Sequence, residues 1–477
     1  MRLLILCLSL HLVSSAWGQI SPLKLNPQDV LRMAIRQSNQ AQEINLQAQQ
    51  SRLTLATAES AFDFSFSANS GYLLSKFHST TTPLLEEKKT LTTQATLEKP
   101  FQTGTLLSLQ YTGATSQPQL SSGSSPDSTE DIAGISLEQN LWRNFFGEAN
   151  RASLRSAEAT VKSSQLTRQV NMQNLAVTAL QSYWNAYVAQ EVFDASVKSR
   201  NRYQKLIDAV KKKTRYGYSN PGELAQAEAE LELREQKVKA QSANFLQALD
   251  QLKTLLKLKP ETQIEFAIPT EVPPPPASPK PLDLESTRAI QASVLSTKAA
   301  EETLTATRSN SWPDLSLVAQ YFVQGLDESQ NTAREQMTSG SQPQYYVGLR
   351  FQHSFGSGFQ DESILNKRAA RDLAQTQLDR QRLETKDQEE DLKRRLQSNY
   401  SIFVSSKNQK ALREKASQEL SKTYTQGRTD ISILIDSLNN FFDAEAALSL
   451  SLANYQITWV QWQALQDKLV TEELLRN

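Results

Sequence analysis

Apolar and polar residues alternate strictly along three stretches of the chain. This period of two predicts β-strands with one apolar face and one polar face. The apolar positions are Phe62, Phe64, Phe66, Ala68, Tyr72 and Leu74, then Leu315, Leu317, Ala319, Tyr321 and Val323, and finally Tyr345, Val347, Leu349, Phe351 and Phe355. Such strands are typical of an outer-membrane barrel, whose apolar face meets lipid and whose polar face lines the lumen. A soluble sandwich would show the same alternation.

Two other stretches carry apolar residues at every seventh position. The first series is Leu224, Leu231, Val238, Phe245 and Leu252, and the second, 210 residues later, is Leu434, Phe441, Leu448, Tyr455 and Trp462, continuing to Leu469. A sustained seven-residue stripe predicts helices that supercoil against a neighbouring helix. An ordinary amphipathic surface helix would drift off this register, since its period is 3.6 residues.

Glycine and proline are absent from several long stretches, which are therefore predicted to be helical. These stretches are 28–70, 148–216, 223–259, 359–426 and 428–477. The runs 148–216 and 359–426 contain 69 and 68 residues. At the rise of an α-helix, each would be roughly 100 Å long. Two rods of matched length indicate an internal repeat.

The chain is therefore interpreted as two structural repeats, 19–267 and 283–477, joined by a proline-rich linker at 268–282. The first repeat comprises a helix at 28–61, barrel strands within 62–142, and helices at 148–216 and 223–259. The second comprises a helix at 285–311, barrel strands within 312–356, and helices at 359–426 and 428–470. The linker contains Pro273–Pro276 and is expected to be extended and semi-rigid.

The first 18 residues have the pattern of an export signal. Arg2 is the positive residue, Leu3–Val13 is the apolar stretch, and Ala16–Gly18 precedes a cleavage site at Gln19. Cys7 lies within this segment, so the mature chain has no cysteine. No later run reaches the ~18 apolar residues that a membrane-spanning helix needs. A crossing of the membrane would therefore require a β-barrel.

The composition does not favour an enzyme. Lys and Arg number 51, as do Asp and Glu, and this balance gives no reason to expect a nucleic acid partner. His78 and His353 are the histidines of the mature chain, and no glycine-rich phosphate loop opens a helix. The sequence predicts no catalytic residue, no metal site and no cofactor.

Several short motifs, in their order and duplication, resemble the TolC-type outer-membrane efflux proteins (outer membrane factors) over about residues 25–465. The motifs are Leu25–Val30 with Ala34 and Asn39, Ile135–Trp142, Tyr216-Gly217 followed by Leu224 and Ala227, and Gly427 followed by Leu434 and Asp436. Gln40 stands where the family usually has a proline. The resemblance implies an α+β membrane protein whose long coiled-coil hairpins form a periplasmic α-barrel. Its strands would contribute to a trimeric β-barrel in the cell outer membrane.

The resemblance also implies partners and a function. A homotrimer would contact a periplasmic adaptor (membrane fusion) protein and, through it, an inner-membrane pump. The duct would conduct substrates passively, without a cofactor. The family has four strands per subunit, but the first half carries a further alternating hairpin at 91–111, which makes six possible. This hairpin could instead fold over the barrel mouth or inside it, and the Ser/Gly/Pro stretch 114–128 is expected to be a mobile loop.

Two groups of functional residues follow from the resemblance. The adaptor-contact tips are Tyr216, Gly217, Tyr218, Ser219, Gly427, Arg428 and Thr429. The periplasmic aperture is assigned to Asp436, Ile433 and Glu223, because family members narrow this mouth with acidic residues just after the tip glycine. Ile433 departs from that acidic pattern. The alternative function is a periplasmic coiled-coil adaptor or structural protein without a membrane barrel, and the transported substrate (drug, metal ion or polypeptide) is not predicted.

Overall fold

The computed structural model of the protein describes residues 22–76, 85–120, 123–269, 271–276, 281–356, 358–471 and 473–474. The predicted export signal at 1–18 and His78 lie outside these residues. The chain forms two compact units. The hairpin unit contains the described residues up to Glu43, those of Asn171–Leu282, and those from Gln388 onward. The sheet unit contains those of Ile44–Val170 and Asp283–Asp387. Each unit thus combines segments of both sequence repeats.

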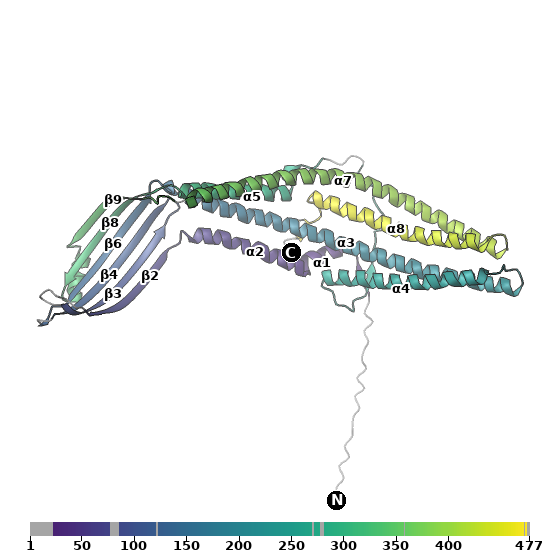
Figure 1. Ribbon diagram of the computed structural model, residues 1–477, viewed down its shortest axis with the longest axis horizontal. Coiled ribbons are helices and arrows are strands. Elements are labelled where there is room, and N and C mark those ends of the chain that lie inside the picture. Colours follow the sequence, from purple (N-terminus) through teal and green to yellow (C-terminus); the bar gives the residue numbers. More distant parts are fainter. Residues whose placement is uncertain are drawn as a thin grey trace, which may run out of the picture. The chain divides into compact units, whose positions relative to one another are not determined.

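Long helices dominate the chain (Figure 1). α3 (Glu148–Arg215) and α7 (Gly358–Thr425) have 68 residues each and contribute to both units. The hairpin unit adds α1 (Pro27–Gln37), α4 (Glu223–Leu255) and α8 (Ile431–Leu465). None of the described helices is both long enough and apolar enough to cross a membrane.

The seven-residue stripes lie on the packed faces of α4 and α8. Leu252, Phe441 and Tyr455 are each at most 5% exposed. Near the hairpin ends, the stripe residue Leu434 joins a buried cluster that also contains Tyr203 of α3 and Tyr424 of α7. Residues from both hairpins therefore form one core at this end of the unit.

The helix predicted over 28–61 is interrupted at Ser38, which has extended backbone angles. The Ser38 hydroxyl donates to the Ala34 carbonyl at 2.6 Å and accepts from the Ala41 amide at 3.1 Å. This capping ends α1 and starts α2 (Asn39–Ser60) without a proline at the break. α8 also ends earlier than the predicted helix 428–470.

A short parallel pair of strands, β1 (Leu23–Leu25) and β7 (Ile264–Phe266), ties the start of the chain to the end of the first repeat. The Tyr183 hydroxyl lies 3.1 Å from the Leu25 carbonyl. Beyond this pair, the linker contacts α8. The Tyr455 hydroxyl of α8 donates a hydrogen bond to the Pro273 carbonyl of the linker at 2.6 Å. Burial raises the pKa of Tyr455 to about 12.

The sheet unit contains a sheet of six strands in the order β2-β3-β4-β6-β8-β9, within the residues described, with the two-residue β5 (Gly123–Ser124) beside β4. The strands span Ser65–Lys76, Leu85–Pro100, Thr105–Leu120, Ser128–Asn140, Asp314–Asp327 and Pro343–Gln352. Neighbouring strands on this path are antiparallel. The additional hairpin is β3–β4, so it is part of the sheet. Residues 114–120, predicted to lie in a loop, belong to β4.

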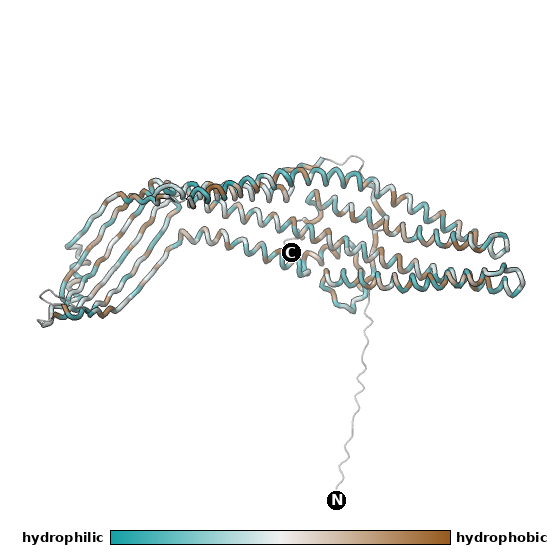
Figure 2. Tube along the Cα trace, viewed as in Figure 1, coloured by the Kyte–Doolittle hydropathy of each residue, from teal (hydrophilic) through white to brown (hydrophobic). Residues whose placement is uncertain are grey.

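One face of the sheet is apolar across all six strands. Phe66, Leu97, Leu109, Ile135, Tyr321 and Tyr345 follow one another in register from β2 to β9. Figure 2 shows hydrophobic and hydrophilic positions alternating along these strands. Phe66, Leu109, Ile135 and Tyr345 are all at least 40% exposed. We call this surface the apolar face.

Exposed aromatic residues gather where the strands meet the helices. Trp142 and Trp312 stack with ring centroids 6.0 Å apart. Phe145 and Phe146, in a short 3-10 turn (Phe145–Gly147), form an edge-to-face pair. Such aromatic rings are enriched at membrane–water boundaries. We call these four residues the aromatic end of the sheet.

The sheet unit also contains α5 (Arg288–Asn310), after the short 3-10 turn η2 (Leu284–Ser286), and the first parts of α3 and α7. Ala149, Ala152 and Ala306 form a buried contact between α3 and α5. A further helix, α6 (Gln330–Ser339), was not expected from the sequence and lies between β8 and β9. The segment 312–356, predicted to hold strands alone, therefore contains a helix as well.

Candidate functional site

The two hairpin ends are built around glycines with left-handed backbone angles. Gly217, Gly222 and Gly427 have φ values of +74°, +88° and +75°, which other residues adopt at a cost. Asp430 then caps α8, because its side chain accepts from the Ser432 amide at 2.8 Å. The sequence therefore places both chain reversals at the ends of long helices.

Glu223 lies at the centre of a hydrogen-bond network at the first tip. It is 5% exposed. Its carboxylate accepts from the Tyr424 hydroxyl at 3.0 Å, from the Asn220 amide group at 3.0 Å and from the Ser219 hydroxyl at 3.2 Å. The Lys213 ammonium is 3.8 Å from the same carboxylate and 4.2 Å from the centroid of the Tyr424 ring. These contacts connect the α3–α4 hairpin to the α7–α8 hairpin.

The electrostatics of this network follow from its burial. Burial is the largest cause of the raised pKa of the Tyr424 hydroxyl, and the hydrogen bond to Glu223 adds to it. Tyr424 therefore remains a neutral donor at neutral pH, while Glu223 accepts. The arrangement binds the two hairpins together.

A polar hollow of about 650 Å³ lies between the two tips. Its lining residues are Lys213, Tyr218, Asn220, Glu223, Thr425, Gln426, Gly427, Arg428, Thr429 and Asp430. Tyr216 and Tyr218 are 76% and 79% exposed. The hollow and these two rings form a surface that combines charged, hydroxyl and aromatic groups.

The three residues assigned to the aperture lie in different environments. Asp436 and Ile433 are exposed on α8, whereas the neighbouring Leu434 is buried. Glu223 is buried within the tip network and does not share their exposed surface. The Asp436 side chain is therefore open to solvent, whereas the Glu223 carboxylate is engaged by groups of its own chain.

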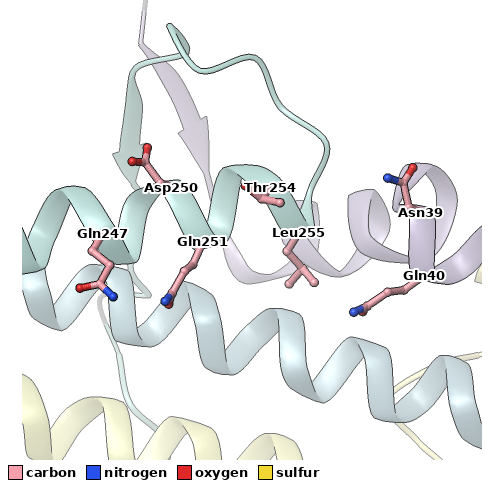
Figure 3. A pocket seen from close by; sticks show the side chains of 7 residues that line it. All are labelled: Asn39, Gln40, Gln247, Asp250, Gln251, Thr254 and Leu255. Carbon is pink, nitrogen blue, oxygen red and sulfur yellow. The ribbon is translucent and has the colours of Figure 1, made fainter.

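A second hollow, of about 740 Å³, lies along the end of α4 and the start of α2. Its lining residues are Asn39, Gln40, Gln247, Asp250, Gln251, Thr254 and Leu255 (Figure 3). Most of these groups are neutral amides, which cannot act as a nucleophile or a general base at neutral pH. Within the part of the chain that is described, no three His, Cys, Asp or Glu side chains gather to hold a metal ion.

Comparison with known families identifies the region that builds the first tip and the strands β4, β5 and β6. Residues 102–256 match the model of the family described as outer membrane efflux protein. The chain carries an outer membrane efflux protein domain. The resemblance to TolC-type efflux proteins that the sequence motifs indicated is thereby confirmed. The comparison with curated proteins found no match to this chain.

The fold of this chain is also found in solved channel structures. The outer membrane protein VceC of Vibrio cholerae has a TM-score of 0.69 and 12% identity, covering 93% of this chain and 97% of that chain. The CmeC outer membrane channel of Campylobacter jejuni has a TM-score of 0.69 and 14% identity, with coverages of 93% and 86%. The open MtrE outer membrane channel of Neisseria gonorrhoeae has a TM-score of 0.65 and 13% identity, covering 93% of this chain and 89% of that chain.

The fold thus brings several of the sequence-predicted tip residues together. Tyr218, Gly427, Arg428 and Thr429 share the polar hollow, whereas Tyr216, Gly217 and Ser219 are not among its lining residues. The sequence motifs did not single out Lys213, Tyr203 or Tyr424. Lys213 and Tyr424 lie four and three residues before their tip glycines, Gly217 and Gly427, whereas no local signal marks Tyr203.

Proposed function

We propose that this protein is the outer-membrane exit duct of a tripartite efflux or secretion system. Three copies would form one barrel in the cell outer membrane and one helical tunnel in the periplasm. The duct would conduct substrates passively, and an inner-membrane pump would supply the energy. The sequence boundaries at 18, 267 and 282 are proposed as the limits of the signal, the first repeat and the linker.

The observation that carries this proposal is the open, apolar-faced sheet. Among the described residues, β2 and β9 are its edges, 12 and 10 residues long, and each pairs along one side only. Lipid cannot satisfy the unpaired backbone of a long edge strand. Pairing β9 of one copy with β2 of the next would close the sheet. Six strands from each of three copies would make an eighteen-stranded barrel.

The tips are proposed to contact a periplasmic adaptor protein. The strongly exposed Tyr218 lines the hollow together with Gly427 and Arg428, and Tyr216 is exposed two residues earlier in the same turn. Exposed aromatic and arginine side chains are frequent anchors of protein interfaces. We further propose that Asp436 and Ile433 border the periplasmic aperture, where three copies of the Asp436 carboxylate would attract cations.

Membrane extraction distinguishes the duct from the alternative adaptor or structural protein. A barrel should resist high salt, dissolve only in detergent, and migrate as a trimer that heating converts to monomer. Release by salt as a monomer would instead favour the periplasmic coiled-coil protein. The apolar face, exposed in the single chain, favours the barrel.

Substitution at the tips tests the adaptor contact. Gly427→Pro or Arg428→Glu should abolish export while the trimer stays in the membrane. Proline cannot adopt the positive φ at Gly427, and glutamate reverses a charge that lines the hollow. Arg413→Glu, at an exposed position on α7 away from the tip, is the matched control and should export normally. Normal export by both tip variants would remove the tips from the mechanism.

A further inference from the structure

α6 packs on the apolar face of the sheet at a position formed by Gly113, Asp131 and Gly325, which we call the α6 seat. Gly113, Asp131 and Gly325 stand side by side in register on β4, β6 and β8. A Cβ atom at Gly325 would lie 1.8 Å from the Ala333 carbonyl oxygen of α6. A Cβ atom at Gly113 would lie 2.7 Å from the Asp131 carboxylate. The two glycines therefore leave the space that α6 and Asp131 occupy.

Polar contacts hold α6 on this seat. Asp131 is fully buried and accepts from the Tyr111 hydroxyl at 2.8 Å. The Arg334 guanidinium of α6 is 3.8 Å from the same carboxylate. Gln336 of α6 accepts from the Leu326 amide at 3.0 Å. These groups lie on the face that also carries Ile135 and Tyr321, because register and alternation place them there.

The outward surface of α6 is polar, unlike the face on which the helix lies. Ala333 and Met337 are the side chains of α6 buried on the sheet. Its exposed residues are Gln330, Asn331, Thr332, Arg334, Glu335, Thr338 and Ser339. Amide, hydroxyl and guanidinium groups are costly to place in hydrocarbon. This surface therefore fits a layer of hydrated polar headgroups.

The distance from the aromatic end to α6 matches a membrane thickness. Ten residues, 132–141, separate Asp131 from Trp142. A tilted membrane-spanning strand uses about 9–11 residues. The apolar face is thus bounded by aromatic rings at one end and by a polar helix at the other.

We propose that α6 lies on the outside of the barrel at the outer-leaflet surface, with its polar side against lipid headgroups. In this position it would set the depth at which the barrel sits in the membrane. The inference rests on the proposed barrel, since it identifies the apolar face with the lipid-facing wall.

Site-specific fluorescence quenching tests the position of α6. Cys7 is the one cysteine of the sequence, so a Cys7→Ser background accepts a single new cysteine. Thr332→Cys places a fluorophore on the exposed side of α6, and Val347→Cys places one on the apolar face. The trimer is folded into phosphatidylcholine vesicles that contain either a nickel-chelating headgroup lipid or a lipid with a mid-chain nitroxide. Each lipid quenches fluorescence at its own depth.

The expected result is a loss of Thr332→Cys fluorescence with the headgroup quencher and of Val347→Cys fluorescence with the mid-chain quencher. If Val347→Cys is quenched but Thr332→Cys is not quenched by the headgroup lipid, the proposal for α6 is overturned. Stronger quenching of Thr332→Cys by the mid-chain lipid would also overturn it. A Val347→Cys label that neither lipid quenches would instead contradict the barrel.

A glycine pair supplies the matched control. In the Thr332→Cys background, Gly325→Ala should displace α6, since the new methyl group collides with the Ala333 carbonyl. Headgroup quenching at Thr332→Cys should then be lost, while quenching at Val347→Cys remains. Gly71→Ala introduces a Cβ with nothing within 4 Å and should change neither signal. Retained headgroup quenching in Gly325→Ala would show that the seat does not position α6.

Discussion

At the scale of single residues, the tip depends on one buried carboxylate. Glu223 accepts hydrogen bonds from three side chains on two segments: Ser219 and Asn220 in the turn before α4, and Tyr424 of α7. Replacing it leaves these donors without their shared acceptor, and a hydrogen bond to a charged group contributes about 1.5–3 kcal/mol. The contact between hairpins is therefore sensitive to this one side chain.

Glu223→Ala is expected to loosen the first tip by about 2–3 kcal/mol, the effect of losing charge-assisted hydrogen bonds. Hydrogen exchange of the backbone amides at 216–222 should become faster. Glu228→Ala is the control, because Glu228 is 52% exposed and its nearest lysine nitrogen, on Lys211, is 3.7 Å away, where an ion pair contributes little. Equal exchange in both variants would contradict the role assigned to Glu223.

Asp436→Ala tests the aperture. If three Asp436 carboxylates border the mouth, their removal should reduce cation selectivity and weaken block by divalent cations, because the local negative potential is lost. Planar-bilayer conductance measures both properties. Asp208→Ala removes another exposed carboxylate, on α3, and should behave like the parent. The aperture assignment fails if Asp436→Ala keeps the selectivity and block of the parent.

The sequence located the tip glycines but not the environment of Glu223. A glycine that permits a tight reversal between long helices is recognisable locally. The partner Tyr424 lies 201 residues away along the chain, and its approach depends on how two hairpins pack. An acidic residue after a tip glycine can therefore be exposed, as Asp436 is, or buried, as Glu223 is, without a local difference.

At the scale of elements, tertiary pairing decided what local composition could not. Residues 114–120 are rich in serine, threonine and glutamine and contain Pro118, yet they extend β4 because β3 and β6 pair on its two sides. The long helices α3 and α7 were predictable because runs of almost 70 residues without glycine or proline, such as 148–216 and 359–426, are rare outside helices. The helix break at Ser38 depends on a side-chain cap, and the position of α6 depends on the space left by Gly325. Neither feature changes the spacing of apolar residues along the sequence, so neither was predicted.

Deleting residues 78–126 tests the β3–β4 hairpin as part of the barrel wall. The sheet would keep four strands on its path, so a trimer that still assembled would enclose a narrower pore. Single-channel conductance should therefore fall, or the heat-modifiable trimer should be lost altogether. Heat-modifiable mobility of the parent run beside the variant separates these two results. Unchanged assembly with unchanged conductance would place the hairpin outside the wall.

At the scale of the whole molecule, the proposed barrel requires the apolar face of the sheet to contact lipid and the opposite face to line the lumen. Val347→Arg places a charge on that face at a side chain that is 74% exposed. Near the bilayer midplane this change costs about 2–4 kcal/mol, so the yield of heat-stable trimer in vesicles should fall. Gln344→Arg, on the opposite face of β9, should fold like the parent. Equal yields for both variants would mean that the apolar face does not meet lipid.

The pairing of β6 with β8 has a consequence for the order in which the chain can fold. Ile135 of β6 pairs with Tyr321 of β8, far later in the sequence. In the same way β1 can pair only after β7 has been synthesised. During synthesis the N-terminal part of the chain is made first. The strands β2 to β6 therefore have an exposed apolar face and an unpaired edge until β8 of the second repeat has been synthesised. Pairings so distant in sequence form slowly, and an open edge can pair with another chain. A chain interrupted before β8 would thus be prone to aggregation, and an intact one would benefit from a chaperone that holds the first strands apart.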